Sequence, residues 1–170
     1  MVLIRTARYE DAASIARVHV ESWRTAYRGI VPEAYLAGLN IEERTTRWGQ
    51  ILTSPSRVLA AERDGKIVGF IAGGPIRQPV GECDAELYAI YIDLPVRGKG
   101  IGTALLSALA KLLDEDGFKS MAAWVLDANS ATTFYQRTGA ASVAAKEIEI
   151  GGALLPATAY AWPSLPKQKP

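Results

Sequence analysis

The chain has 170 residues, of which 49% are hydrophobic and 22% are charged. These proportions are those of an ordinary globular domain, so they exclude a disordered chain, a collagen-like repeat and a long coiled coil. Nineteen Lys and Arg residues against eighteen Asp and Glu residues leave a net charge of +1. This balance gives no overall field that would attract nucleic acid or an anionic membrane, so we expect neither as a partner.

Cysteine and histidine counts exclude two further kinds of protein. Cys83 is the only cysteine and His19 the only histidine, so neither an internal disulfide nor a Cys/His zinc cluster can form, and we expect no metal. The apolar residues 2–4 are followed at once by Arg5, and no apolar run approaches the ~20 residues that cross a bilayer. We therefore expect a cytoplasmic protein.

Hydrophobic periodicity predicts the elements of the first half of the chain. In chain order they are a strand at residues 2–6, a helix over 10–30, short helices at 32–39 and 42–52, and strands at 58–61 and 67–72. Glu10 and Asp11 favour the start of the first helix, because negative charge stabilises a helix N-terminus. Asp64-Gly65 between two apolar runs predicts a tight hairpin.

The second half of the chain predicts strands that alternate with helices. In order they are a strand at residues 83–92, a helix at 103–113, a strand at 121–126, a short helix at 129–137, and a strand pair at 142–150 and 153–162. Strands and helices mixed in this order predict a single α+β domain (an α/β mixed sheet) over residues 1–163, antiparallel first and then parallel through a helical crossover. The proline-rich residues 164–170 predict a flexible tail.

A glycine-rich segment between a strand and a helix is a candidate anion site. It reads Arg97-Gly98-Lys99-Gly100-Ile101-Gly102-Thr103, and unpaired amides at such a helix start can hold a phosphate group. A P-loop would need Ser or Thr after Lys99, and a dinucleotide fingerprint would need a different glycine spacing directly after the strand. Neither motif fits.

At this point the chain resembles the GNAT superfamily of acyl-CoA-dependent N-acetyltransferases. Arg97, Gly100 and Gly102 fill that family's pattern Arg/Gln-x-x-Gly-x-Gly/Ala. The strand at 86–92 is similar to the family's fourth strand, and residues 129–140 are similar to its second CoA motif. The resemblance implies a mixed sheet splayed between its fourth and fifth strands, which form a parallel pair, with about four flanking helices.

The resemblance also implies a reaction and a set of cofactor contacts. An amine attacks the acetyl thioester of acetyl-CoA directly, and Tyr135 stands near the sulfur as proton donor. The residues implied to contact acetyl-CoA are Ile90, Tyr91, Ile92, Arg97, Gly98, Lys99, Gly100, Ile101, Gly102, Thr103, Asn129 and Tyr135.

The acceptor amine needs a proton acceptor, because at a pKa of ~10.4 only about one molecule in a few thousand is free amine at pH 7. Asp84, Glu86 and Tyr88 share strand parity, so the two carboxylates are candidates for the general base. The family uses a carboxylate on this strand; we favour Glu86 and keep Asp84 second.

The acceptor end is less clear from the sequence. Trp23 and Tyr27 lie in the first helical region, which lines the acceptor site in this family, and Tyr88 shares the face of the candidate base. We expect a small-molecule amine as acceptor; a protein N-terminus or lysine, and a non-catalytic acyl-CoA sensor, remain alternatives. The strand at 153–162, as an edge strand, could pair with a second copy in a homodimer.

Overall fold

Seven strands form one mixed sheet in the order β1-β2-β3-β4-β5-β7-β6. The computed structural model describes residues 1–167. The strands are β1 (Leu3–Thr6), β2 (Arg57–Arg63), β3 (Lys66–Pro75), β4 (Ala85–Ile92), β5 (Met121–Leu126), β6 (Ala141–Ile150) and β7 (Ala153–Trp162). The helices are α1 (Ala12–Ala26), α2 (Glu33–Ala37), α3 (Ile41–Leu52), α4 (Ile101–Glu115) and α5 (Ala131–Arg137), with short 3-10 turns at Tyr9–Asp11 and Leu94–Val96.

The predicted mixed sheet is confirmed, with five α-helices in the described chain where about four were expected. The Asp64-Gly65 hairpin is also present, since both residues have the positive φ values, 51° and 73°, that a tight turn requires. Several boundaries were wrong: α1 ends at Ala26 and not at residue 30, and β4 begins at Ala85 and not at residue 83. Of the predicted tail, Leu165 packs on the core and its amide donates to the Lys119 carbonyl; residues 168–170 lie outside the described residues.

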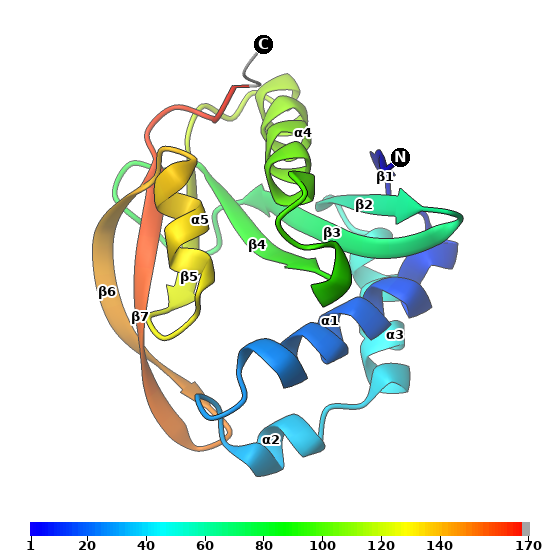
Figure 1. Cartoon of the computed structure of the whole chain (residues 1–170). Coiled ribbons are helices and arrows are strands. Elements are labelled where there is room, and N and C mark those ends of the chain that lie inside the picture. The colour runs from blue at the N-terminus through cyan, green and yellow to red at the C-terminus, as the bar shows by residue number, and fades with distance from the viewer. Residues whose placement is uncertain (168–170) are drawn as a thin grey trace.

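The helices cover the two faces of the sheet. Figure 1 shows α4 and α5 on one side, with α1, α2 and α3 on the other. The core on the α4 side includes Leu105, Leu109 and Trp162, all fully buried. No helix within residues 1–167 is long and apolar enough to cross a membrane.

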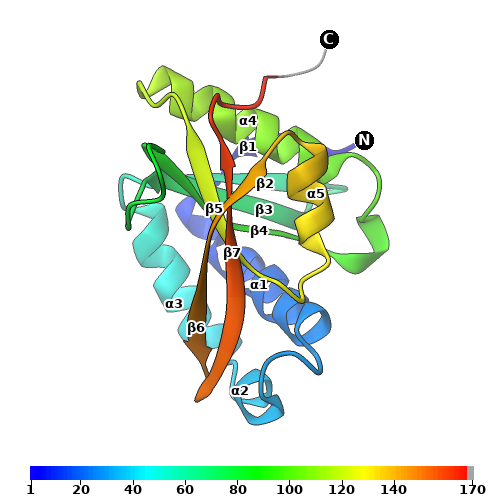
Figure 2. The same ribbon diagram turned by 90° about the vertical axis from the view of Figure 1, so that its left-hand side faces the viewer.

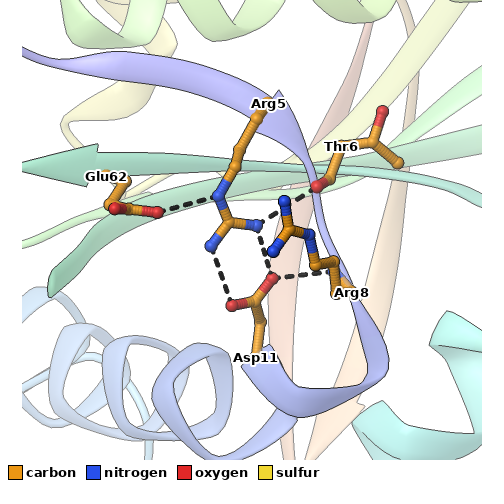
Figure 3. Close-up of polar contacts among 5 residues, drawn as sticks. All are labelled: Arg5, Thr6, Arg8, Asp11 and Glu62. Atoms are coloured by element: carbon orange, nitrogen blue, oxygen red, sulfur yellow. Dashed lines mark hydrogen bonds and ion pairs between the residues drawn. The ribbon is translucent and has the colours of Figure 1, made fainter. Parts of the chain in front are cut away.

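A polar cluster fixes the start of the chain to α1 and β2 (Figure 3). The Arg5 guanidinium donates two hydrogen bonds to the Asp11 carboxylate, at 2.7 and 3.0 Å, and one to Glu62 at 2.8 Å. The Arg5 side chain lowers the pKa of Asp11 by hydrogen bonding to it, although burial opposes this shift. The cluster therefore holds the N-terminal end of α1 against the sheet.

The sheet splits between β4 and β5. These parallel strands pair only at Ala85 with Met121 and at Glu86 with Ala122, and beyond that point they diverge, as Figure 1 shows. The predicted splay is therefore confirmed. It leaves the later part of β4 without a β5 partner on that edge.

A β-bulge in β4 lies just beyond the last pair. Ala72 pairs with Ala89 and Gly73 with Leu87, so Tyr88 is an extra residue with no partner on β3. A Cβ atom on Gly73 would come within 2.8 Å of the Glu86 carbonyl oxygen. Glycine is therefore needed opposite the bulge, because β4 approaches β3 closely there.

The edge strand is β6, not β7. β7 lies between two strands: it pairs with β5, where Met121 stands opposite Trp162, and with β6 on its other side. The expectation that residues 153–162 form a free edge was therefore wrong. Both strands carry the same period, and the sequence does not tell which one inserts next to β5. The long β6–β7 hairpin reaches down to α2 (Figure 2), where Gly151 packs against the Tyr35 ring.

His19 lies inside the α1 face and is neutral. Its Nδ1 atom accepts a hydrogen bond of 3.1 Å from the indole N–H of Trp48, and its ring stacks on Tyr91 with centroids 5.2 Å apart. Burial lowers the pKa of His19 from 6.5 to about 3, with smaller contributions from the charges of Arg44 and Arg47. The histidine therefore stays unprotonated in the folded protein at any ordinary pH.

We predict that His19 makes the fold sensitive to acid. Between pH 6.5 and about 3 the unfolded chain binds a proton at His19 and the folded chain does not, so stability falls as pH decreases through this window. From pH 7.5 to pH 5 the loss is roughly 2 kcal/mol in the free energy of unfolding. In His19→Gln this part of the pH dependence should disappear in urea unfolding at the two pH values; an unchanged slope would show that other groups cause it.

Candidate functional site

The glycine-rich loop before α4 presents a row of free backbone amides. Gly98 and Gly100 have φ values of 74° and 80°, which turn successive N–H groups to one side of the chain. From Gly98 to Thr103, no backbone N–H donates a hydrogen bond to another group of residues 1–167. Arg97 is also among the loop residues predicted to contact acetyl-CoA, but its backbone N–H is not free, since it donates to the Leu94 carbonyl.

Positive charge and a groove adjoin these amides. The Arg97 Nε atom donates to the Ile92 carbonyl at 2.7 Å, which fixes the loop to the end of β4. A groove of about 860 Å³ runs between the start of α4 and α5, with Gly100, Thr103 and Arg137 in its lining. This arrangement fits an anion at the amides and an extended molecule in the groove beside them.

The free edge of β4 leads from this loop into the split. Residues Ile90, Tyr91 and Ile92 pair with β3 on one side and have no β5 partner on the other. An extended amide-containing chain can hydrogen-bond to such an edge as an added strand does. The predicted cofactor residues 90–92 therefore have an edge of the strand without a strand partner.

Tyr135 is a buried phenol on α5. Its ring packs edge-on against Trp162, with centroids 5.6 Å apart, and lies 5.9 Å from the Tyr160 ring. Burial raises the pKa of Tyr135 above its ordinary value of 10. The hydroxyl is therefore protonated at neutral pH, as a proton donor must be.

Asn129 forms a bridge between α5 and α1. Its amide nitrogen donates to the Tyr27 hydroxyl at 2.9 Å, and its carbonyl oxygen accepts from the Ala131 amide at the start of α5. The predicted cofactor residue Asn129 and the predicted acceptor residue Tyr27 thus lie side by side. Nearby, burial raises the pKa of Tyr91, and the Tyr27 and Tyr135 hydroxyls contribute to that shift.

Glu86 is buried on the α1 face of β4 and is paired with Arg77. The backbone N–H and Nε of Arg77 donate to Glu86 Oε2 at 3.1 and 3.0 Å, and Nη2 donates to Oε1 at 2.8 Å. Only 7% of the Glu86 side chain is exposed, against 63% of Arg77. The sequence contained no signal for this ion pair, which depends on the β3–β4 loop folding back over the strand.

Asp84 lies before β4 and connects the loop to β5. Its carboxylate accepts hydrogen bonds of 2.9 Å from the amides of Lys119 and Ser120 and from the Ser120 hydroxyl. Burial alone would raise the pKa of Asp84, but these hydrogen bonds outweigh it and lower the pKa. The expected alignment with Glu86 along one strand face is not found, because Asp84 lies one residue before the start of β4 and its carboxylate bonds to Lys119 and Ser120.

Aromatic residues line the α1 side of the split. Trp23 and Tyr27 on α1 lie with ring centroids 4.5 Å apart, and both pack with Trp124 of β5 in one apolar cluster. On the other side of the split, Tyr88 lies beneath the Arg77 guanidinium, 4.3 Å from it. The structure thus brings the three predicted acceptor residues to one face and adds Trp124, which sequence reasoning missed.

A mixed sheet that splits between two parallel strands, with a loop of free backbone amides after the first of them, is typical of transferases that take their acyl group from a CoA thioester. No cluster of three or more His, Cys, Asp or Glu side chains suited to a metal ion occurs within residues 1–167.

Comparisons with known proteins agree with this class. Residues 18–140 match the family model described as the acetyltransferase (GNAT) family. YuaI, an uncharacterised N-acetyltransferase of Bacillus subtilis (strain 168), is 39% identical over 165 residues, which are 97% of this chain and 95% of that protein. The spermidine N(1)-acetyltransferase of Thermoplasma acidophilum is 29% identical over 144 residues, covering 80% of this chain and 86% of that protein.

A solved structure adds the cofactor. The crystal structure of the PaiA N-acetyltransferase of Thermoplasma acidophilum in complex with coenzyme A is similar at a TM-score of 0.70 and 25% identity, and covers 93% of this chain and 98% of that one. The chain therefore belongs to the GNAT family of acetyltransferases. It is an acyltransferase that uses acetyl-CoA, and the reaction of this family uses no metal.

Proposed function

We propose that the protein transfers the acetyl group of acetyl-CoA to the primary amine of a small molecule. The observation that supports this most strongly is the row of free amides from Gly98 to Thr103 at the mouth of the β4–β5 split. Acetyl-CoA supplies the acetyl thioester when bound. The amides and Lys99 would hold its diphosphate, and the free edge of β4 its pantetheine arm.

We further propose the roles of two side chains. Glu86, on the α1 face just before the β4 bulge, accepts the proton of the acceptor ammonium, so that the free amine forms a bond to the acetyl carbon as the C–S bond breaks. Tyr135, protonated because burial raises its pKa, donates its proton to the departing thiolate. The second proton, which the nitrogen loses as the amide forms, returns to the Tyr135 phenolate. Asp84 instead holds the start of β4 to the segment before β5, because its hydrogen bonds come from the Lys119 and Ser120 amides and the Ser120 hydroxyl.

The direct test of the proposed activity is thiol release from acetyl-CoA in the presence of an acceptor panel. The panel contains small amines, including spermidine because of the relative that bears its name, and peptides with a free N-terminus or a lysine. Release with small amines supports the proposal. Faster release with peptides would favour a protein acetyltransferase, and acetyl-CoA binding with no release on any acceptor would favour a sensor.

We predict that Glu86→Gln lowers kcat/KM by about 10²-fold at pH 7, within the usual range for a general base. The loss should shrink as pH rises, because more of the acceptor is then free amine and needs no base. Asp84→Asn is the matched comparison. It should lower the melting temperature, because hydrogen bonds to a neutral amide are weaker than those to the Asp84 carboxylate, and it should leave kcat/KM nearly unchanged. The reverse pattern would make Asp84 the base.

The cytoplasmic location and a homodimer stay predictions. If a dimer forms through a sheet edge, the exposed strand β6 is the candidate for the contact.

A further inference from the structure

Two cations lie on aromatic rings of the two diverging strands. The guanidinium carbon of Arg77 is 4.3 Å from the centre of the Tyr88 ring on β4, and the ammonium of Lys146 is 4.0 Å from the Trp124 ring on β5. Tyr88 and Trp124 each stand two residues beyond the last β4–β5 pair. The two cations therefore flank the place where the strands part.

The residue after Arg77 contacts the second cation. Lys146 Nζ donates a hydrogen bond of 3.1 Å to Gln78 Oε1, and Gln78 follows Arg77 directly in the β3–β4 loop. The ammonium of Lys146 is thus held at a defined place by a ring below it and an amide beside it. Both contacts come from segments more than twenty residues away in the sequence, so they depend on the fold.

The two cations differ in their pairing. Arg77 is paired with Glu86 through three hydrogen bonds, whereas Lys146 forms no ion pair with a carboxylate of residues 1–167. The unpaired ammonium of Lys146 repels a further positive charge beside it and attracts an anion.

The hydrogen-bonding groups left free on this face favour the same class of acceptor. A carboxylate has about four acceptor positions, and Arg77 uses three of those of Glu86, which leaves one for an ammonium. Lys146 has three N–H groups and one protein acceptor. The indole N–H of Trp124 is buried and has no acceptor within residues 1–167.

We propose that the acceptor is an amine that also carries a carboxylate, such as an amino acid. Its ammonium takes the remaining acceptor position of Glu86, and its carboxylate binds Lys146 beside the Trp124 ring. Lys146 is then the residue that determines specificity. The proposal rests on the proposed function, because it places the reacting amine at Glu86.

The test compares two acceptor classes in the wild-type enzyme and in Lys146→Glu. The acceptors are the common amino acids and 4-aminobutyrate on one side, and butylamine and 1,4-diaminobutane on the other. The wild type should acetylate its best amino acid with a kcat/KM at least about tenfold above that of either alkylamine, the usual scale for a hydrogen bond to a charged group. Lys146→Glu should remove this preference, raise the rate with the diamine, and leave the KM for acetyl-CoA unchanged.

Lys111→Glu is the control variant. Lys111 is an exposed lysine on α4, on the opposite face of the sheet (Figure 1), so it changes the net charge equally without touching the acceptor face. Alkylamines acetylated as fast as amino acids by the wild type, or a carboxylate preference that survives Lys146→Glu, would overturn the proposal while thiol release upholds the transferase. If acetyl-CoA binds but no thiol is released with any of these acceptors, nor with peptides, both this proposal and the proposed transferase activity would be overturned.

Discussion

Replacing Gly100 by Asp is expected to weaken acetyl-CoA binding by at least about 100-fold, which corresponds to about 2.7 kcal/mol. Gly100 lies in the middle of the free amides and has a φ of 80°. An Asp carboxylate there would compete for the amides at the start of α4 and repel the diphosphate. Isothermal titration with acetyl-CoA measures the effect directly.

Gly117→Asp is the matched control for this loss. Gly117 also has a positive φ, 95°, and open space where a Cβ would stand, but it follows the far end of α4. Gly117→Asp should lose about 1–2 kcal/mol of stability because it forces an L-residue into the left-handed region, and Gly100→Asp should lose less because its carboxylate also caps α4. Only Gly100→Asp should lose affinity; equal affinities in the two variants would remove the loop from the cofactor site.

Tyr135→Phe is expected to lower kcat by about 10²-fold and to leave the Kd for acetyl-CoA nearly unchanged. The change removes the proton for the departing thiolate and keeps the ring that packs against Trp162. The measurement is steady-state thiol release at saturating acetyl-CoA and acceptor. A moderate loss is expected because a thiolate leaves reasonably well unaided.

Tyr160→Phe provides the comparison for Tyr135→Phe. Tyr160 is a buried phenol on β7 whose ring lies 5.9 Å from that of Tyr135. Tyr160→Phe removes a hydroxyl from the same core, but this hydroxyl is carried by β7 and not, like that of Tyr135, by α5. If both variants lowered kcat equally, the effect of Tyr135 would be one of packing and not of proton donation.

Local signals made much of the fold, and the conformation of the glycine-rich loop, predictable from the sequence. The Asp64-Gly65 turn and the glycines before α4 require backbone conformations that few other residues adopt. The pair Gly73-Gly74 is a different signal that could have revealed the β4 bulge, because it marks a close approach and not an unusual φ: a Cβ on Gly74 would approach the Tyr88 hydroxyl to 2.9 Å. Glycines inside a strand indicate a bulge or a close approach.

The acceptor end was less predictable because it is built from long-range contacts. Arg77 meets Glu86 only when the β3–β4 loop folds over the strand, and Lys146 reaches Trp124 only because β7 inserts between β5 and β6. Periodicity places each of these residues on a strand or loop but does not give the order of strands. Asp84 illustrates the same limit, since β4 begins at Ala85 and not at residue 83, which leaves Asp84 outside the strand.

The central claim is that the free amides from Gly98 to Thr103 hold the diphosphate of the cofactor. It is tested most directly by following the backbone amide signals of ¹⁵N-labelled protein during titration with acetyl-CoA. We expect the largest shifts at Gly98, Gly100 and Gly102, and slower hydrogen exchange of these amides in the complex. Saturation with acetyl-CoA that leaves these three signals in place and equally exchangeable would contradict the account.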